Sequence, residues 1–301
     1  MNIASTSAIP GTTNRWLIAG IVAFHLLILG ALPWLLAQSM WWGMLLVGLA
    51  FIHITHWALI HEGIHKLLVP NTAANDRLGR LLGIMLGASF HVLRFGHLMH
   101  HKLNRDWYSE WVEERTLGSK LGYYWHLLFG LYVTEVATSI LIAILPNETA
   151  IRLARRTVFK HAPEAAVAGE RFFYTRNHVR AVRQDMALSV LLYGVALWHF
   201  GALWPMLVAF FLVRAFVISF LDNIYHYATP ADNSKAGKEL LVPGFYGLLL
   251  LNGNYHETHH LNPDVPWTSL PDTHNAQGRV FNGGFIDHGL QQFHGPLVSY
   301  A

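Results

Sequence analysis

The sequence predicts an all-α integral membrane protein with four transmembrane helices in two hairpins, further interfacial or re-entrant helices, and a cytoplasmic cap. Charged residues make up only 13% of the 301 residues, and the mean hydropathy is +0.31, whereas soluble domains carry about 25% charged residues. Five apolar stretches, residues 16–38, 41–60, 121–145, 186–200 and 203–221, approach the ~20 residues that a helix needs to cross a bilayer. Cysteine is absent, which excludes disulfides and thiolate metal sites.

The first two apolar stretches predict a tight helical hairpin over residues 16–62, because only two residues separate them. The first stretch is too long for the apolar core of a secretory signal. Residues 1–14, which precede it and are rich in Ser and Thr, are expected to form a flexible tail. Residues 71–101 mix apolar runs with Arg77, Arg80 and Arg94, a composition typical of a helix that lies on the membrane surface.

We expect residues 121–145 to form a re-entrant or interfacial element rather than a span. A single crossing would place the basic loop that follows, residues 152–183, on the outer side, against the positive-inside rule. It would also expose Glu135 to lipid, where a lone carboxylate is costly. Residues 186–226 then form the second hairpin, which turns near Gly201, and residues 229–301 form the cytoplasmic cap of a single membrane-bound domain.

The basic residues lie beside the apolar stretches rather than in a separate patch. The net charge of +3 therefore does not indicate a nucleic-acid partner. The positions of the basic residues predict that the loops at 66–105 and 152–183 face the cytoplasm at the cell inner membrane. Attraction to anionic lipid head groups is the ordinary role of such a loop.

Eight histidines stand in three short clusters at spacings of three and four residues. They are His61 and His65, then His97, His100 and His101, and finally His256, His259 and His260. Each residue advances a helix by about 100°, so each cluster can aim two or three ring nitrogens at one point. Imidazole suits zinc, copper, nickel and iron. A single zinc needs at most four donors, so eight histidines are enough for two metal ions.

Further polar residues stand near these clusters. Asp222 and His226 lie four residues apart at the end of the last apolar stretch and would add one carboxylate and one imidazole to the same metal centre. Glu62 and Glu257 adjoin predicted ligands and are expected either to orient the imidazoles or to be solvated carboxylates. Asn254 is expected either to support the third cluster by a hydrogen bond or to form a turn.

Arg214 lies inside an apolar stretch, two turns before Asp222. An arginine within the membrane is a candidate functional residue, and it would steer a substrate head group or pair with Glu135. Snorkelling to the interface is the ordinary alternative. Histidines outside the clusters, such as His25 and His53, are expected to pack or cap.

The clusters resemble the histidine boxes of the membrane-bound fatty acid desaturase and hydroxylase superfamily, which includes carotenoid ketolases and hydroxylases. The resemblance rests on HEGIH at 61–65, HLMHH at 97–101, NYHETHH at 254–260 and the following LNPDVPW at 261–267, and it covers roughly residues 41–271. It implies a non-haem centre of two iron ions that is held by the box histidines, with Asp222 and His226 as the additional ligand pair. It also implies oxidation of an unactivated C–H bond with O2 as co-substrate.

The resemblance implies a fatty acid desaturase that introduces a double bond into an acyl chain. The substrate would be a lipid or an acyl thioester of coenzyme A or an acyl-carrier protein. Carotenoid ketolase or hydroxylase and fatty acyl hydroxylase or acetylenase are the alternatives within the superfamily. Electrons are expected from a separate ferredoxin or cytochrome b5-type donor with its reductase, for which the basic loop at 152–183 would be a docking face. A histidine-rich metal transporter is the alternative of another class, although transport sites lie near the bilayer midplane.

Overall fold

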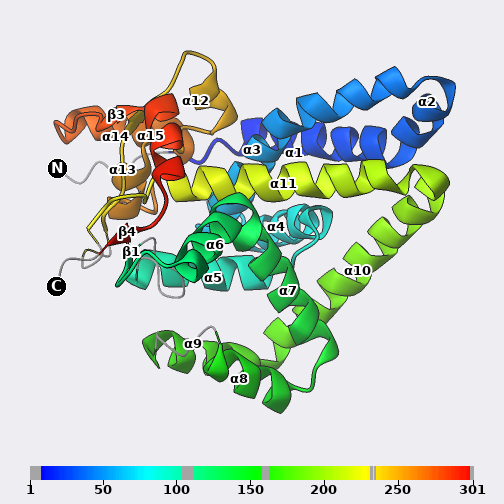
Figure 1. Cartoon of the computed structure of the whole chain (residues 1–301), viewed down its shortest axis with the longest axis horizontal. Helices are drawn as coiled ribbons and strands as arrows, with labels where there is room; N and C mark the ends of the chain where they lie inside the picture. The colour runs from blue at the N-terminus through cyan, green and yellow to red at the C-terminus, as the bar shows by residue number, and fades with distance from the viewer. Residues whose placement is uncertain (1–7, 104–110, 158–162, 231–232, 234, 299–301) are drawn as a thin grey trace.

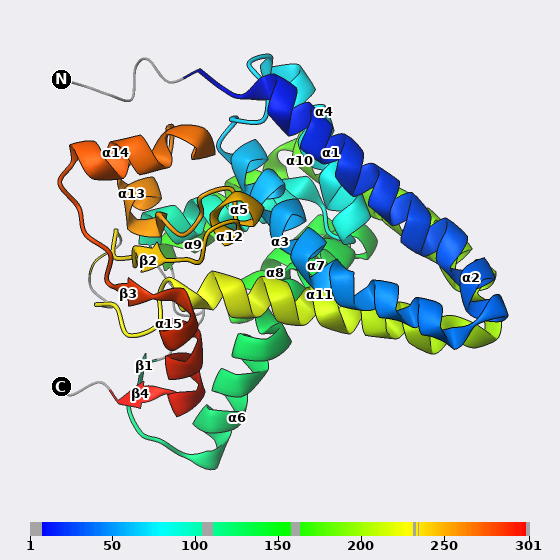
Figure 2. The same ribbon diagram turned by 90° about the horizontal axis from the view of Figure 1, so that it is seen from above.

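The computed structural model describes residues 8–103, 111–157, 163–230, 233 and 235–298. These residues are mostly helical, and their strands are only two residues long. Long helices extend to one side of the molecule, whereas the short C-terminal helices gather at the opposite end (Figure 1). A view from above shows the same separation (Figure 2). By length and composition, four helical segments could cross a membrane: Gly11–Gln38, Met40–Ile64, Leu117–Ile144 and the 48-residue segment Asn177–Ile224.

The first hairpin is confirmed. Its outgoing arm comprises α1 (Gly11–Leu26), a π-helical turn (Leu27–Ala31) and α2 (Leu32–Gln38), and its return arm comprises a 3₁₀ turn (Met40–Met44) and α3 (Leu45–Ile64). Between them Ser39 is extended, and its hydroxyl accepts a hydrogen bond from the Trp41 amide. The outgoing helix begins earlier than expected, inside the segment 1–14 that was predicted as a flexible tail. Asn14 is fully buried there because its amide donates to the carbonyls of Leu67 and Leu68.

Helices α4 (Thr72–Leu86) and α5 (Phe90–Leu103) follow and meet at an angle of 100°. Residues 71–101, expected to form a helix on the membrane surface, are thus a bent pair of helices, and their position relative to the membrane stays a prediction. Gly87 ends α4 in the left-handed region with φ of 90°, where glycine alone avoids a steric penalty. Gly79 lets the two helices meet closely, because a Cβ there would lie 2.4 Å from the Phe90 ring. The bend brings the histidines of α5 against the end of α3.

Residues 121–145, expected to be re-entrant or interfacial, contain no re-entrant turn, and whether they cross the membrane or lie at its interface stays a prediction. They belong to one 28-residue helix, Leu117–Ile144, built from α6 (Leu117–Trp125), a π-helical turn (His126–Gly130) and α7 (Leu131–Ile144). The expectation that a crossing helix would expose Glu135 to lipid was wrong, because the Glu135 side chain is 91% buried. It approaches α5 at Gly96, where a Cβ would lie 2.6 Å from the carboxylate oxygen. The carboxylate is therefore held inside the protein rather than exposed to lipid.

The second hairpin is confirmed as well. It follows α8 (Asn147–Arg156) and α9 (Pro163–Tyr174) and consists of α10 (Arg176–Phe200), a 3₁₀ turn (Gly201–Leu203) and α11 (Trp204–Ile224). Gly201 makes the turn with φ of 50°. Buried apolar residues join the two hairpins, among them Ile28, Leu32 and Phe210. Figure 1 shows α11 running beside α3, so the histidine-bearing ends of both helices reach the C-terminal region.

The C-terminal region is built from short elements. They are β2 (Leu240–Leu241), α12 (Tyr246–Leu249), α13 (His256–Leu261), a 3₁₀ turn (Trp267–Ser269), α14 (Leu270–Ala276), β3 (Gly283–Gly284), α15 (Phe285–Gln291), a second 3₁₀ turn (Gln292–His294) and β4 (Leu297–Val298). Strand β2 pairs with β3 in parallel, and β4 pairs in parallel with β1 (Trp111–Val112). Helix α13 lies at the ends of α3, α5 and α11, because its histidines meet His61, His100 and His226 there.

Candidate metal centre

The structure brings nine histidines together in two adjoining groups. The first group contains His61, His65, His97, His101 and His259, and the second contains His100, His226, His256 and His260. Within each group one ring nitrogen per residue lies within 4.8 Å of all the others. The groups touch, because the rings of His101 and His260 stack with centroids 4.3 Å apart. All eight box histidines, and His226 from the additional pair, are thus placed at one centre.

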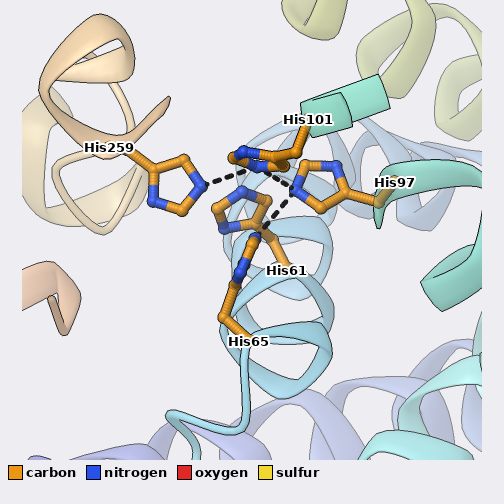
Figure 3. A group of neighbouring side chains, drawn as sticks. All are labelled: His61, His65, His97, His101 and His259. Carbon is orange, nitrogen blue, oxygen red and sulfur yellow. Dashed lines mark hydrogen bonds between the residues drawn. The ribbon is translucent and has the colours of Figure 1, made fainter. Parts of the chain in front are cut away.

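The five-histidine group lies between two long helices and the cap (Figure 3). Nε2 of His97 is 3.0 Å from Nε2 of His65 and 2.9 Å from that of His101. Nε2 of His259, from α13, is 3.1 Å from Nε2 of His101. The His61 ring lies among these rings, with its centroid 4.3 Å from that of His259.

The four-histidine group lies against the end of α11. His226 follows the last turn of that helix, and its Nε2 is 2.7 Å from Nε2 of His256. Nε2 of His256 is also 3.1 Å from Nε2 of His260, one turn along α13. His100, from α5, closes the group, with its ring centroid 4.5 Å from that of His226.

The donor atoms fit a cation better than they fit hydrogen bonds among themselves. A neutral imidazole carries one N–H and one lone pair. Nε2 of His97 and Nε2 of His101 each face two other Nε2 atoms. Each neutral ring has only one N–H to donate, so some of these nitrogens would direct lone pairs at one another. A metal ion would accept those lone pairs, and imidazole is a common ligand of iron, zinc and copper. Both groups can therefore hold a metal.

The cap keeps its imidazoles in the neutral form that metal binding requires. Burial, reinforced by the neighbouring histidines, holds the pKa of His259 well below its usual value of 6.5. The same two causes, with burial the larger, lower the pKa of His256 and of His260. The site thus offers lone pairs rather than ring cations at neutral pH.

Spacing along the helix decides which histidines share a group. His61 and His65, His97 and His101, and His256 and His260 are pairs four residues apart, and each pair stays together. Residues four apart differ by only about 40° around a helix. Each cluster thus aims two ring nitrogens at one point, and the second and third clusters each contribute their remaining histidine to the other group. His100 leaves the second cluster for the four-histidine group, and His259 leaves the third for the five-histidine group, because each is about 100° from the preceding or following member.

Asp222 lies beside the two histidine groups but belongs to neither of them among the described residues. One of its carboxylate oxygens accepts a hydrogen bond of 3.3 Å from the indole of Trp57. Its assignment as a metal ligand remains a prediction. Tyr225, three residues later, stacks on the ring of His256 with centroids 4.6 Å apart.

The other predicted supporting residues occupy distinct places. Glu62 is buried, with one oxygen 4.0 Å from Nδ1 of His61 and the other accepting from the Trp267 amide. Asn254 is buried and donates to the carbonyl of Leu240. Glu257 pairs with Arg279.

Arg214 takes interior partners in the membrane helices. It is fully buried and donates to Tyr193, to the Leu86 carbonyl and to Nε2 of His25 at 2.8–2.9 Å. It therefore neither snorkels nor pairs with Glu135 in this structure.

Sequence reasoning missed Glu239. This carboxylate is buried and accepts hydrogen bonds from the backbone N–H and the hydroxyl of Thr258, at 2.7 and 2.6 Å. It also accepts from Nε of Arg279 at 3.1 Å. Thr258 lies between His256 and His259, so these hydrogen bonds to Glu239 fix the position of the third histidine cluster. An acidic residue in a loop far from any histidine gives no pattern that would have indicated this role.

A narrow, largely apolar cavity of about 70 Å³ borders both groups. His61, His256 and His259 form its metal-facing wall, together with Asp222 and Tyr225. Its remaining walls come from α3, α11, α14 and the segment after α12. Their aliphatic residues are Ile54, Ala58, Val217, Ile218, Leu221, Leu250, Leu251 and Leu270. The cavity therefore presents an apolar surface beside the two histidine groups.

A helical membrane protein with two groups of converging histidines beside an apolar cavity belongs to the class of membrane-bound histidine-box metalloenzymes. Residues 39–283 match the family model described as fatty acid desaturase, so the chain belongs to the fatty acid desaturase family. It is also similar to a β-carotene ketolase from Paracoccus sp. (strain PC1), with 23% identity over 287 residues that cover 90% of this chain and 98% of that protein. Membership in an enzyme family sets aside the metal transporter.

Proposed function

We propose that this protein catalyses the O2-dependent oxidation of an unactivated C–H bond in a lipid-dissolved substrate. The observation that carries the proposal is the convergence of nine imidazoles in two adjoining groups, of which His61, His256 and His259 line an apolar cavity. When bound there, a pair of iron ions supplies O2 activation and hydrogen abstraction, and the protein supplies binding and orientation.

The two groups divide the proposed ligands between two ions. The five-histidine group would hold one ion and the four-histidine group would hold the other. Asp222 keeps its predicted place beside the second ion, since its carboxylate borders the same cavity as His256. Glu62 orients His61, and Glu239 orients the histidines of α13 through Thr258, in the way that carboxylates commonly fix metal-bound imidazoles.

The aliphatic walls of the cavity bind the substrate and exclude water from the centre. They hold one carbon atom opposite His61, His256 and His259, so that the reacting bond is positioned before oxidation begins. Trp57 also lines the cavity, and its hydrogen bond to Asp222 holds that carboxylate at the wall.

An acyl chain is the first candidate substrate, and its product is a double bond. The family match supports this reaction, with the chain presented as a lipid or as a thioester. A carotenoid is the second candidate, and its product is a ring ketone. The similarity to a β-carotene ketolase along nearly the whole length of both chains favours this alternative.

Expression in two hosts separates the candidates. One host is rich in saturated acyl lipids and the other accumulates β-carotene, and lipids and pigments from both are analysed by mass spectrometry. New unsaturated acyl chains with unchanged pigment support desaturation, whereas oxygenated pigment with unchanged acyl chains supports ketolation. If neither changes when iron and an electron donor are supplied, the proposed oxidation of these substrates is wrong.

Electrons come, in this proposal, from a separate ferredoxin or cytochrome b5-type protein with its reductase. We propose a location in the cell inner membrane with the histidine-bearing end facing the cytoplasm. The basic residues near α8 and α9 support this orientation. They include Arg152, Arg155, Arg156, Arg171, Arg180 and Arg183.

A further inference from the structure

An uncharged apolar run lies within the C-terminal region, outside the segments that could span the membrane. Residues 240–251 read LLVPGFYGLLLL, and no Asp, Glu, Lys or Arg occurs between Glu239 and Glu257. A run of this length is typical of a buried core segment or of a re-entrant or interfacial membrane segment. It is not a buried core, because Leu241, Phe245 and Leu248 are 59%, 65% and 64% exposed.

The middle of this run packs against a membrane helix. The hydroxyl of Thr55, on α3, donates to the Leu249 carbonyl at 2.9 Å, and the rings of Phe51 and Tyr246 lie 6.0 Å apart. Thr55 is nine residues before Ile64, the last residue of α3, which corresponds to about 14 Å along the helix. Both views show α12 close beside α3 (Figures 1 and 2).

The exposed face of α12 continues the lipid-facing surface of α3. On α3, Val47 is 60% exposed and Phe51 is 39% exposed, as expected for a span whose outer face meets acyl chains. Leu248 and Phe245 extend that surface toward the metal-binding end. Aromatic residues such as Phe245 and Tyr246 are also typical of a segment that lies at a membrane interface.

The return from α12 leads directly to the cavity. Leu251 and Asn252 adopt left-handed backbone conformations, with φ of 47° and 55°, which is uncommon for residues other than glycine. The Asn252 amide donates to the Trp267 carbonyl at 3.0 Å and holds this turn. Leu250, Leu251 and Gly253 then form part of the cavity wall. One short segment thus joins the apolar outer surface to the inside of the cavity.

We propose that α12 and its flanking residues 241–248 insert into the bilayer, with lipid hydrocarbon covering Leu241, Phe245 and Leu248. The C-terminal region is then anchored in the membrane at the rim of the cavity. A consequence, which rests on the proposed function, is that a lipid-dissolved substrate reaches the metal centre at this rim without passing through water.

Single engineered thiols test the insertion, because the natural chain contains no cysteine. Leu248→Cys is labelled with a bimane fluorophore and reconstituted in phosphatidylcholine vesicles that carry a nitroxide on the acyl chain. Val47→Cys serves as the membrane control, and Asn275→Cys, exposed on α14, serves as the aqueous control. We expect the label at position 248 to be quenched by the lipid nitroxide and shielded from iodide, as at position 47.

Quenching of position 248 by iodide, as at position 275, would overturn the proposal. Shielding from both quenchers would also overturn it, because that result indicates a covering protein surface rather than lipid. Neither measurement depends on enzyme activity, so a failure here leaves the proposed oxidation standing. For the consequence, Leu248→Asp should lower turnover of a vesicle-embedded substrate at least about tenfold, as expected for a charge placed in hydrocarbon, at unchanged metal content. Unchanged turnover would exclude entry at this rim.

Discussion

The two histidine groups present the same ring chemistry on different structural supports. In the five-histidine group, His61, His97 and His101 stand on the long helices α3 and α5, and His65 caps the end of α3. Only His259 comes from the cap. In the four-histidine group, only His100 stands on one of those helices. His226 lies just beyond the end of α11, and His256 and His260 belong to α13, which has six residues.

This difference shows which parts of the chain hold each proposed ion. Helices α3 and α5 are held by fully buried side chains such as Leu59, Ile60 and Phe90. An isolated helix as short as α13 is unstable in water, so its position depends on tertiary contacts, above all those of Glu239 with Thr258. The membrane helices therefore fix the first group, whereas docking of the cap completes the second.

The largest effect is expected from His259→Ala, which removes the donor that links α13 to the five-histidine group. We expect loss of product and a lower metal content, because no backbone group can replace the imidazole. Product is measured by mass spectrometry and metal by elemental analysis of the purified protein. His294→Ala, a histidine that is exposed and in neither group, is the matched control. Full turnover of the His259 variant would refute its assignment.

Removing one donor from each group compares how well the two groups retain metal. His65→Ala leaves four imidazoles in the first group, whereas His226→Ala leaves three in the second. We expect the His226 variant to retain less metal per chain, because its group has fewer donors and looser support. Elemental analysis after dialysis against a weak chelator measures the difference. Equal retention would mean that donor number and support do not distinguish the groups.

A smaller effect is expected from Glu239→Gln, which weakens the acceptor for Thr258 and Arg279 but keeps its shape. Changes of residues that orient metal ligands typically cost about 10–100-fold in metal affinity or activity. Competition with a metal-sensitive dye measures the affinity, and the second group should weaken more than the first. Glu257→Gln is the control, because Glu257 pairs with the same Arg279. An equal loss of metal affinity in both variants would mean that the ion pairs with Arg279, rather than the hydrogen bonds to Thr258, support the metal site.

The smallest effect concerns the pH dependence of the metal-free protein. Burial lowers the pKa of His259 and His260 in the folded state, whereas the unfolded chain takes up protons near the ordinary value of about 6.5. Stability should therefore be unaffected by these groups above that pH and should fall as the pH drops below it. Thermal unfolding between about pH 8 and pH 5 measures this. The fall should be smaller in His260→Gln than in His294→Ala, and identical profiles would contradict the assignment.

Much of the architecture could be predicted because hydrocarbon imposes simple rules. The spans of both hairpins follow from apolar length, and Gly201 follows from the need to turn between α10 and α11. For the helix at 117–144, the sequence did not show whether Glu135 faces lipid or the inside of the protein. Whether a polar side chain in an apolar stretch faces lipid or a neighbouring helix depends on packing, and here the contact at Gly96 decided it.

The sequence by itself determined the membrane class, both hairpins and the nine histidines of the centre, because apolar length and four-residue spacing express local helix geometry. Only the tertiary structure decided how those histidines divide, that His100 and His259 leave their own boxes, and that Glu239 holds α13. It also brought the apolar run at 240–251 against α3. These outcomes depend on where distant segments meet, and contacts between residues far apart in the chain leave no local periodicity to read.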